Sequence, residues 1–301
     1  MRNFLIILWL VAQVTITAKA QSNDTLILLS KYDFPAYASH GHLERAETIA
    51  LRIKNAMSFQ RELLGFQPGI TLLVLDTGDW HQYASKGAVY GMPHFNEKDK
   101  KLIVAAEDNP FWKSFLPPLD VLPEELAKDI GATYRSANGQ LSMQAFFDLL
   151  AIHELGHAFH MQGGLTMQRP WLGELFVNIF LHTYIAEREP ALLPALTVFP
   201  KMVLAGGTKE FTYTSLPDIT QRYDEIAMKY PKNYGWYQCR WHYAAAAIYD
   251  AGGKQVLRKL WDALKNNKER LNDEQLIQFL HTMTDKSIAD MMEHWDRDTI
   301  R

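Results

Sequence analysis

His153, Glu154 and His157 stand in the pattern His-Glu-x-x-His, the strongest indication of chemistry in the sequence. On a helix, side chains at positions i and i+4 lie on one face, about 5 to 6 Å apart at Cβ. Both imidazoles could therefore bind one tetrahedral zinc ion. Glu154 would lie beside the open coordination position, where a general base can take a proton from metal-bound water.

A zinc ion held by two histidines needs a third protein ligand if the fourth position is to stay open to water. Glu174 is the next acidic residue after His157, and its neighbours between Trp171 and Asn178 are apolar. A buried carboxylate is costly without a partner, and a metal ion would be one. We therefore predict that His153, His157 and Glu174 bind one Zn²⁺ per chain. The alternative for Glu174 is a carboxylate favoured by the dipole of a first helical turn.

These residues resemble the gluzincin metallopeptidases, which join His-Glu-x-x-His to a downstream Glu on the following helix. The closest likeness is to the small peptidase MA-like families, related to the aminopeptidase N-like and thermolysin-like catalytic domains. The Trp-Leu-x-Glu sequence that leads into Glu174 is also typical of the group. The resemblance implies a zincin-like fold, zinc ligands at His153, His157 and Glu174, and a catalytic base at Glu154.

The segment from Tyr237 through a run of alanines to Gly252-Gly253 is similar to a downstream helix of the same group. The resemblance places Tyr237 where aminopeptidase N-like enzymes carry a tyrosine that stabilises the transition state. Its hydroxyl would donate a hydrogen bond to the developing oxyanion. Tyr234 is the main alternative, because aromatic residues at helical spacing are usually core residues.

The likeness covers residues 146–264, and the sequence departs from the family in three ways. The spacer between His157 and Glu174 is shorter than in the larger enzymes. Asn178 stands where thermolysin-like members carry an Asp that holds a ligand histidine, and an amide raises imidazole basicity less than a carboxylate does. Residues 87–92 lack the Glu that binds the free amine of a substrate, which argues against classical aminopeptidase specificity.

Two other reactive side chains have simpler interpretations. His160 follows His157 by three residues, and we predict a packed or capping histidine rather than a ligand. Cys239 is the single cysteine, so it cannot form an intrachain disulfide. Its aromatic, helical surroundings indicate a small buried hydrophobic residue.

The composition is that of a globular protein. The chain has 301 residues, of which 48% are hydrophobic and 12% aromatic, enough to bury a core and too rich in apolar residues for disorder. Lys and Arg number 31 against 34 Asp and Glu, giving a formal net charge of -3. With no basic excess to bind phosphates, nucleic acid is an unexpected partner.

The N-terminus has the features of a signal peptide. Arg2 precedes an apolar stretch from Phe4 to Val14, and Ala18 and Ala20 are small residues at the positions that a signal peptidase reads. We predict cleavage after Ala20 and export to the periplasm or the medium. The alternative is an uncleaved anchor, although the apolar stretch falls short of the ~20 residues that span a bilayer. No other segment is apolar enough for stable membrane insertion of the mature chain.

The elements that must position these residues indicate an α+β fold. Hydrophobic periodicity predicts strands at 25–29, 70–75 and 101–106, a helix at 43–64 ended by Gly65, and a loop at 87–95 that leads to a sheet edge. Helices then follow from Ser142 to Gly163, from Pro170 to Pro190, at 236–251 and at 254–264. We predict one peptidase domain at 21–301, with an α/β sub-domain at 21–140 and a mainly helical sub-domain at 141–301 that carries the zinc site.

The predicted function is that of an exported zinc-dependent metallopeptidase, which acts on peptide or protein substrates added to the sheet edge as an extra strand. The alternative is a catalytically inactive, zinc-containing peptide-binding protein, suggested by Asn178 and by the two possible tyrosines. A purely structural zinc site is disfavoured, because such sites close all four positions and prefer Cys. The sequence carries no signal for oligomeric state or for endo- against exopeptidase action.

Overall fold

The structure is a computed structural model that describes residues 26–136 and 139–296. The predicted signal peptide at residues 1–20 lies outside the described residues. Within them, no helix combines the length and the apolar character that a membrane span requires.

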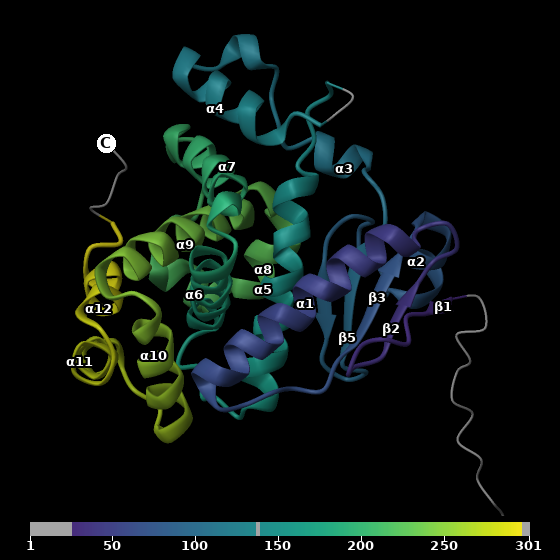
Figure 1. Ribbon diagram of the computed structural model, residues 1–301. Coiled ribbons are helices and arrows are strands. Elements are labelled where there is room, and N and C mark those ends of the chain that lie inside the picture. The colour runs from purple at the N-terminus through teal and green to yellow at the C-terminus, as the bar shows by residue number, and fades with distance from the viewer. Residues whose placement is uncertain (1–25, 137–138, 297–301) are drawn as a thin grey trace, which may run out of the picture.

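A small mixed sheet forms one side of the molecule (Figure 1). Its five strands lie in the order β1-β2-β3-β5-β4, where β1 is Ile27–Leu28, β2 is Ala36–Ala38, β3 is Thr71–Leu75, β4 is His94–Asn96 and β5 is Lys101–Ala105. The three inner strands are parallel, whereas β1 and β4 pair antiparallel at the two edges. The apolar runs of β3 and β5 are buried, as expected of parallel strands covered on both faces. The short strand β4 is left at a free edge.

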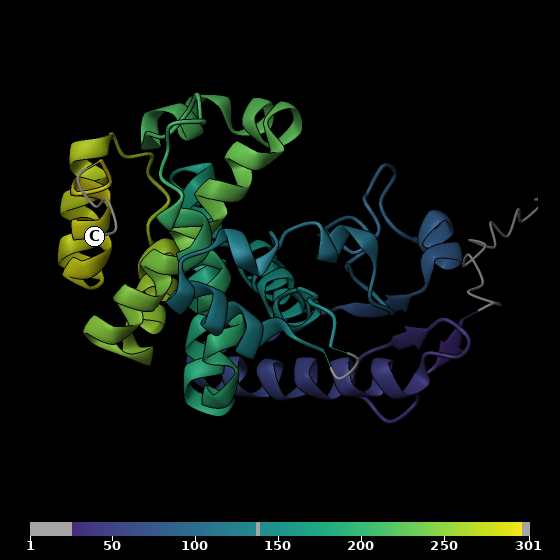
Figure 2. The same cartoon turned by 90° about the horizontal axis from the view of Figure 1, so that it is seen from above.

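Helices make up most of the rest of the chain, so the predicted α+β class is confirmed. They are α1 (Leu43–Leu64), α2 (Thr77–Tyr83), α3 (Pro110–Lys113), α4 (Glu124–Tyr134), α5 (Gln144–Gln162), α6 (Pro170–Arg188), α7 (Leu193–Ala205), α8 (Leu216–Lys229), α9 (Pro231–Gly252), α10 (Lys254–Asn266), α11 (Asp273–Met283) and α12 (Lys286–Glu293). Figures 1 and 2 show α5 between the sheet on one side and helices α6 to α12 on the other.

Most predicted helix ends agree with the structure. Gly65 ends α1 with φ 70°, a left-handed conformation that glycine adopts without strain. Helix α5 begins at Gln144, two residues after the predicted start at Ser142, whose hydroxyl accepts a hydrogen bond from the backbone N–H of Gln144. Helix α9 begins at Pro231, five residues earlier than predicted, because proline is suited to a first helical turn, where its missing N–H has no partner to bond.

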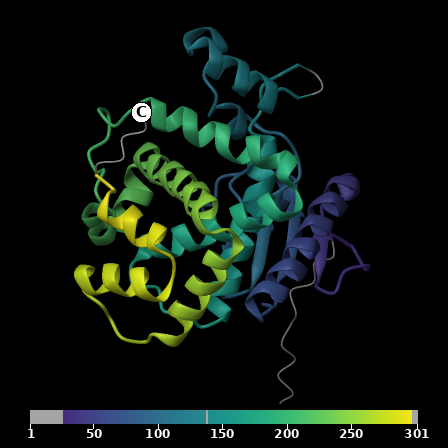
Figure 3. The same cartoon turned by 60° about the vertical axis from the view of Figure 1, so that its left-hand side comes forward.

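Helix α7 was not predicted, because Pro194 and Pro200 interrupt its sequence. Pro194 lies in its first turn, where proline is tolerated, whereas Pro200 lies in its interior. The Tyr134 hydroxyl of α4 enters the turn before Pro200, where it donates to the Ala195 carbonyl at 2.8 Å and accepts from the Phe199 amide at 3.1 Å. The side chain of one helix thus completes the backbone hydrogen bonding of another. In Figure 3, α4 stands out from the rest of the fold above α7.

Helix α5 is the central element. It packs against α1, α6, α7, β4 and β5, and most of its residues are buried. Arg45 of α1 forms a two-pronged ion pair with Asp148 of α5, at 2.6 and 3.1 Å, and also donates to the Ala105 carbonyl at the end of β5. One arginine thus ties α5 both to α1 and to the sheet. The buried apolar residues form one hydrophobic core that both halves of the chain share.

Candidate metal centre

Helices α5 and α6 bring the predicted ligands together. The rings of His153 and His157 lie on one face of α5, with centroids 5.0 Å apart. His153 Nε2 is 3.3 Å from Glu174 Oε2, and His157 Nε2 is 3.8 Å from Glu174 Oε1. His153, Glu154 and His157 also offer ligand atoms within 4.8 Å of one another. This buried group could therefore hold a metal ion.

Gly156 allows the two helices to approach this closely. A Cβ atom at this position would lie 3.0 Å from Cβ and Cγ1 of Val177 and 3.3 Å from Cδ1 of Phe180, both on α6. These atoms belong to a β-branched side chain and an aromatic ring, close to the backbone of α6, and not to the far end of a flexible side chain. The glycine inside His-Glu-Leu-Gly-His thus sets the distance between the histidines and Glu174.

Replacing Gly156 by Ala is expected to destabilise the metal-free protein by about 1–2 kcal/mol, because overpacking outweighs the gain in helix propensity. The matched control is Gly235→Ala on α9, where a Cβ would meet no atom within 4 Å. That change is expected to stabilise the protein by about 0.5–1 kcal/mol. Chemical denaturation of the three proteins measures both effects. Equal stability of the Gly156→Ala variant and the wild type would show that the contact between the helices is loose.

The backbone of the edge strand β4 forms a hydrogen bond with Glu154, the predicted general base. The backbone N–H of Phe95, on β4, donates to Glu154 Oε2 at 2.9 Å. Burial raises the pKa of Glu154 to about 7, with a further contribution from the charge of Glu174, whereas His153 and the Phe95 amide act in the opposite direction. A carboxylate with a pKa near neutrality is well suited to both accept and return a proton. The predicted loop that leads to a sheet edge thus ends at this site.

Asn178 of α6 contacts the back of the His153 ring. Because the amide nitrogen of Asn178 donates elsewhere, its Oδ1 accepts from His153 Nδ1 at 3.2 Å, so this ring nitrogen carries a proton. The amide nitrogen of Asn178 donates to the Glu174 carbonyl at 3.0 Å and points to Gln238 Oε1 at 3.5 Å. An aspartate here would lose both donors and add a negative charge near Glu174. An asparagine therefore fits the surroundings of this position better than an aspartate.

His160 is buried, as predicted, but it also contacts a predicted ligand. Its Nε2 lies 3.0 Å from His157 Nδ1, which leaves Nε2 of His157 facing Glu174. Burial lowers the pKa of His157 to about 4, and burial together with His157 lowers that of His160 to about 3. Both rings are therefore neutral near pH 7. The spacing of three residues on one helix was the sequence signal for this contact.

The carboxylate of Glu174 has two partners that were not predicted. Tyr223 of α8 donates to Oε1 at 2.7 Å, and Gln238 of α9 donates to Oε2 at 2.9 Å. Burial disfavours the charged form, but His157, His153 and Gln238 together hold the pKa of Glu174 below its usual range. His153 is affected in the opposite sense: burial lowers its pKa, but the hydrogen bond to Glu174 and the nearby carboxylates raise it overall.

Tyr237 does not lie where the resemblance placed it. Its buried hydroxyl donates to the Ser215 carbonyl at 2.8 Å, and its ring stacks on Trp241 and Trp295. On α9 the face that turns toward Glu174 carries Tyr234 and Gln238, which are separated by four residues. The expectation for Tyr237 is corrected because this residue lies on another face of the helix.

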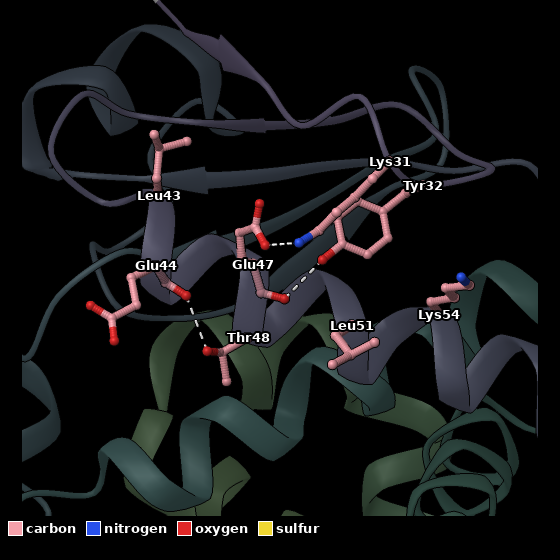
Figure 4. Close-up of a pocket in the computed structure, with 8 residues that line it drawn as sticks. All are labelled: Lys31, Tyr32, Leu43, Glu44, Glu47, Thr48, Leu51 and Lys54. Carbon is pink, nitrogen blue, oxygen red and sulfur yellow. Dashed lines mark hydrogen bonds and ion pairs between the residues drawn. The ribbon is translucent and has the colours of Figure 1, made fainter.

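Two surface pockets lie away from these residues, along the outer face of α1. One has a volume of about 700 Å³, and Figure 4 shows the eight residues that line it. The other, of about 510 Å³, adjoins it and shares Thr48 and Leu51. Polar groups of the first pocket bond to one another: Lys31 pairs with the Glu47 carboxylate, and Tyr32 donates to the Glu47 carbonyl. These contacts do not single out a ligand.

Comparison with known proteins gives no family assignment. No protein-family model matches the chain, and none of the curated proteins searched is similar to it. The contacts around His153, Glu154, His157 and Glu174 are therefore the basis for assigning a function.

Proposed function

We propose that the protein is a zinc-dependent metallopeptidase in which His153, His157 and Glu174 bind one Zn²⁺ and Glu154 is the general base. The observation that supports this most is the convergence of two imidazole Nε2 atoms on the two oxygens of Glu174, at 3.3 and 3.8 Å. Two histidines and one carboxylate form a catalytic zinc ligand set that leaves a fourth position for water. Within this proposal the fold is zincin-like.

The protonation states of His157 and Glu174 fit a divalent cation. Metal ligands must be deprotonated, and the pKa directions leave His157 neutral and Glu174 ionised near pH 7. The pKa of His153 is raised by Glu174, so a bound ion would take the place of a proton on this ring. Glu154 and Glu174 are two carboxylates in one buried site, where an unpaired negative charge is costly. A bound cation would supply the missing positive charge.

In the proposed reaction, bound zinc would activate a water molecule and stabilise negative charge on the substrate carbonyl. Glu154 accepts a proton from the attacking water and returns it to the leaving amine. The Phe95 amide orients the carboxylate of Glu154 by holding Oε2. Because β4 is an edge strand, an extended substrate can add its backbone alongside it, next to this base.

Tyr234 replaces Tyr237 as the proposed donor to the oxyanion. Its hydroxyl lies 2.9 Å from the Tyr223 hydroxyl and 2.8 Å from Gln238 Nε2, and both of these residues bind Glu174. A donor of this kind contributes about 3 kcal/mol to transition-state stabilisation. The alternative function is a zinc-containing peptide-binding protein without turnover, which the engagement of the Tyr234 hydroxyl with Tyr223 and Gln238 favours.

The test is to load the purified protein with zinc and incubate it with a pool of peptides with free or blocked termini. Mass spectrometry then identifies new chain ends. We expect cleavage that a chelator stops and that added zinc restores. A protein that holds one zinc ion and binds peptides without cleaving them would instead be the inactive binder.

For secretion, we propose a signal peptide cleaved after Ala20, which the N-terminal sequence of the secreted protein would test.

A further inference from the structure

Four hydrogen bonds form a closed ring around the Glu174 carboxylate. Tyr223 bonds to Oε1 at 2.7 Å and Gln238 Nε2 bonds to Oε2 at 2.9 Å. Tyr234 closes the ring, 2.8 Å from Gln238 Nε2 and 2.9 Å from the Tyr223 hydroxyl. The three side chains come from α8 and α9 and meet Glu174 of α6, so the ring ties three helices to one carboxylate.

The chemistry of the groups fixes the direction of each hydrogen bond. An ionised carboxylate only accepts, so the single proton of Tyr223 goes to Glu174. Tyr234 must then donate its own proton to the oxygen of Tyr223. The amide nitrogen of Gln238 has two hydrogens, one for Glu174 and one for the oxygen of Tyr234. Every donor in the ring has an acceptor.

The same amide connects the ring to a second proposed ligand. Gln238 Oε1 lies 3.5 Å from the amide nitrogen of Asn178, whose Oδ1 accepts from His153. The orientations of Gln238 and Asn178 are thus consistent with each other. One directed network orients the His153 ring and the Glu174 carboxylate at once.

We propose that Tyr223 is a positioning residue of the metal centre. It orients the Glu174 carboxylate for the ion, and its oxygen accepts the hydrogen bond that Tyr234 donates. This inference rests on the proposed metal site. Both oxygens of Glu174 accept hydrogen bonds from side chains of this network while they face His153 Nε2 and His157 Nε2. The carboxylate is therefore already oriented, and it loses little conformational freedom when the ion binds. Tyr234 becomes available to a substrate only when it releases Tyr223.

The test compares Tyr223→Phe with Tyr237→Phe. Each change removes one hydroxyl that makes a short hydrogen bond, to Glu174 in the first case and to the Ser215 carbonyl in the second. We measure the zinc affinity by competition with a chelator of known affinity, and the stability of the metal-free proteins by thermal unfolding. Tyr223→Phe is expected to weaken zinc binding about 10- to 100-fold. Tyr237→Phe is expected to lose stability but to bind zinc as the wild type does.

Equal zinc affinity of Tyr223→Phe and the wild type would overturn the positioning role. If Tyr223→Phe does not fold, Gln238→Met decides instead, because it removes the donor to the other oxygen of Glu174 and should weaken zinc binding by a similar factor. Wild-type affinity in Gln238→Met would then overturn the proposal. A wild-type protein that binds zinc but cleaves no peptide would contradict the proposed peptidase function alone. A wild-type protein without zinc affinity would overturn both.

Discussion

Replacing Glu154 by Gln is expected to reduce peptide hydrolysis by about 10²- to 10⁴-fold while the protein keeps one zinc ion per chain. Glutamine has the same shape, and its amide oxygen can still accept the hydrogen bond from Phe95. The glutamine side chain cannot take up a proton at neutral pH, so the variant lacks the proposed general base. The three proposed zinc ligands are unchanged. Turnover and zinc content are measured on the same preparations.

The matched control is Glu124→Gln, which makes the same change in the exposed first turn of α4 and should leave both quantities unchanged. A Glu154→Gln variant that cleaves peptides at the wild-type rate would show that another group is the base. If wild type and variant each hold one zinc ion and neither has activity, the peptide-binding alternative gains support.

Replacing His157 by Ala is expected to abolish tight zinc binding and the stabilisation that zinc provides. Two ligands would remain, and His160 would lose its hydrogen-bond partner. A ligand that binds only the folded state stabilises it by about 2.7 kcal/mol at a concentration 100 times its Kd. The wild type should therefore unfold at a higher temperature with zinc than with a chelator, whereas the two curves of the variant should coincide.

His281→Ala on α11 is the control, because this histidine is exposed and lies outside the proposed site. It should keep the zinc-dependent shift in full. A His157→Ala variant with the same shift as the wild type would mean that the stabilising ion binds elsewhere, and the ligand set proposed here would be wrong.

The proximity of the proposed ligands could be predicted because it depends on local rules. His153 and His157 share a face of α5 by helical spacing alone, and the prolines and glycines around α5 and α6 mark both helices in the sequence. Glu174 is the first acidic residue after them. One helical turn and one tight helix pair were enough to predict this part of the site.

The partners of Glu174 could not be predicted in the same way, because they depend on long-range packing. Tyr223 lies on α8, which was not predicted although Ser215 and Asp218 form a capping box at its start. Three tyrosines, Tyr230, Tyr234 and Tyr237, lie at or near the start of α9, and spacing alone does not tell which of them faces the site. The packing of α9 against α6 and α8 turns Tyr234 toward Glu174 and Tyr237 toward Ser215.

The sheet edge also combines features that the local sequence predicts with features that depend on long-range packing. The strand-forming residues of β3 and β5 are evident in the sequence, whereas β4 has three residues and no clear alternation. Its role depends on the contact between the Phe95 amide and Glu154, two residues that are 59 positions apart in the chain. Only the packing of α5 against β4 and β5 brings the base to the free edge.

The most direct test of the central claim is a crystal structure of the zinc-loaded protein, with anomalous diffraction recorded at the zinc absorption edge. We predict one ion that lies about 2.0–2.2 Å from His153 Nε2, His157 Nε2 and an oxygen of Glu174, with a water molecule as a further ligand. An ion bound elsewhere, or a Glu174 carboxylate turned away from an ion on the two histidines, would contradict the proposed metal centre.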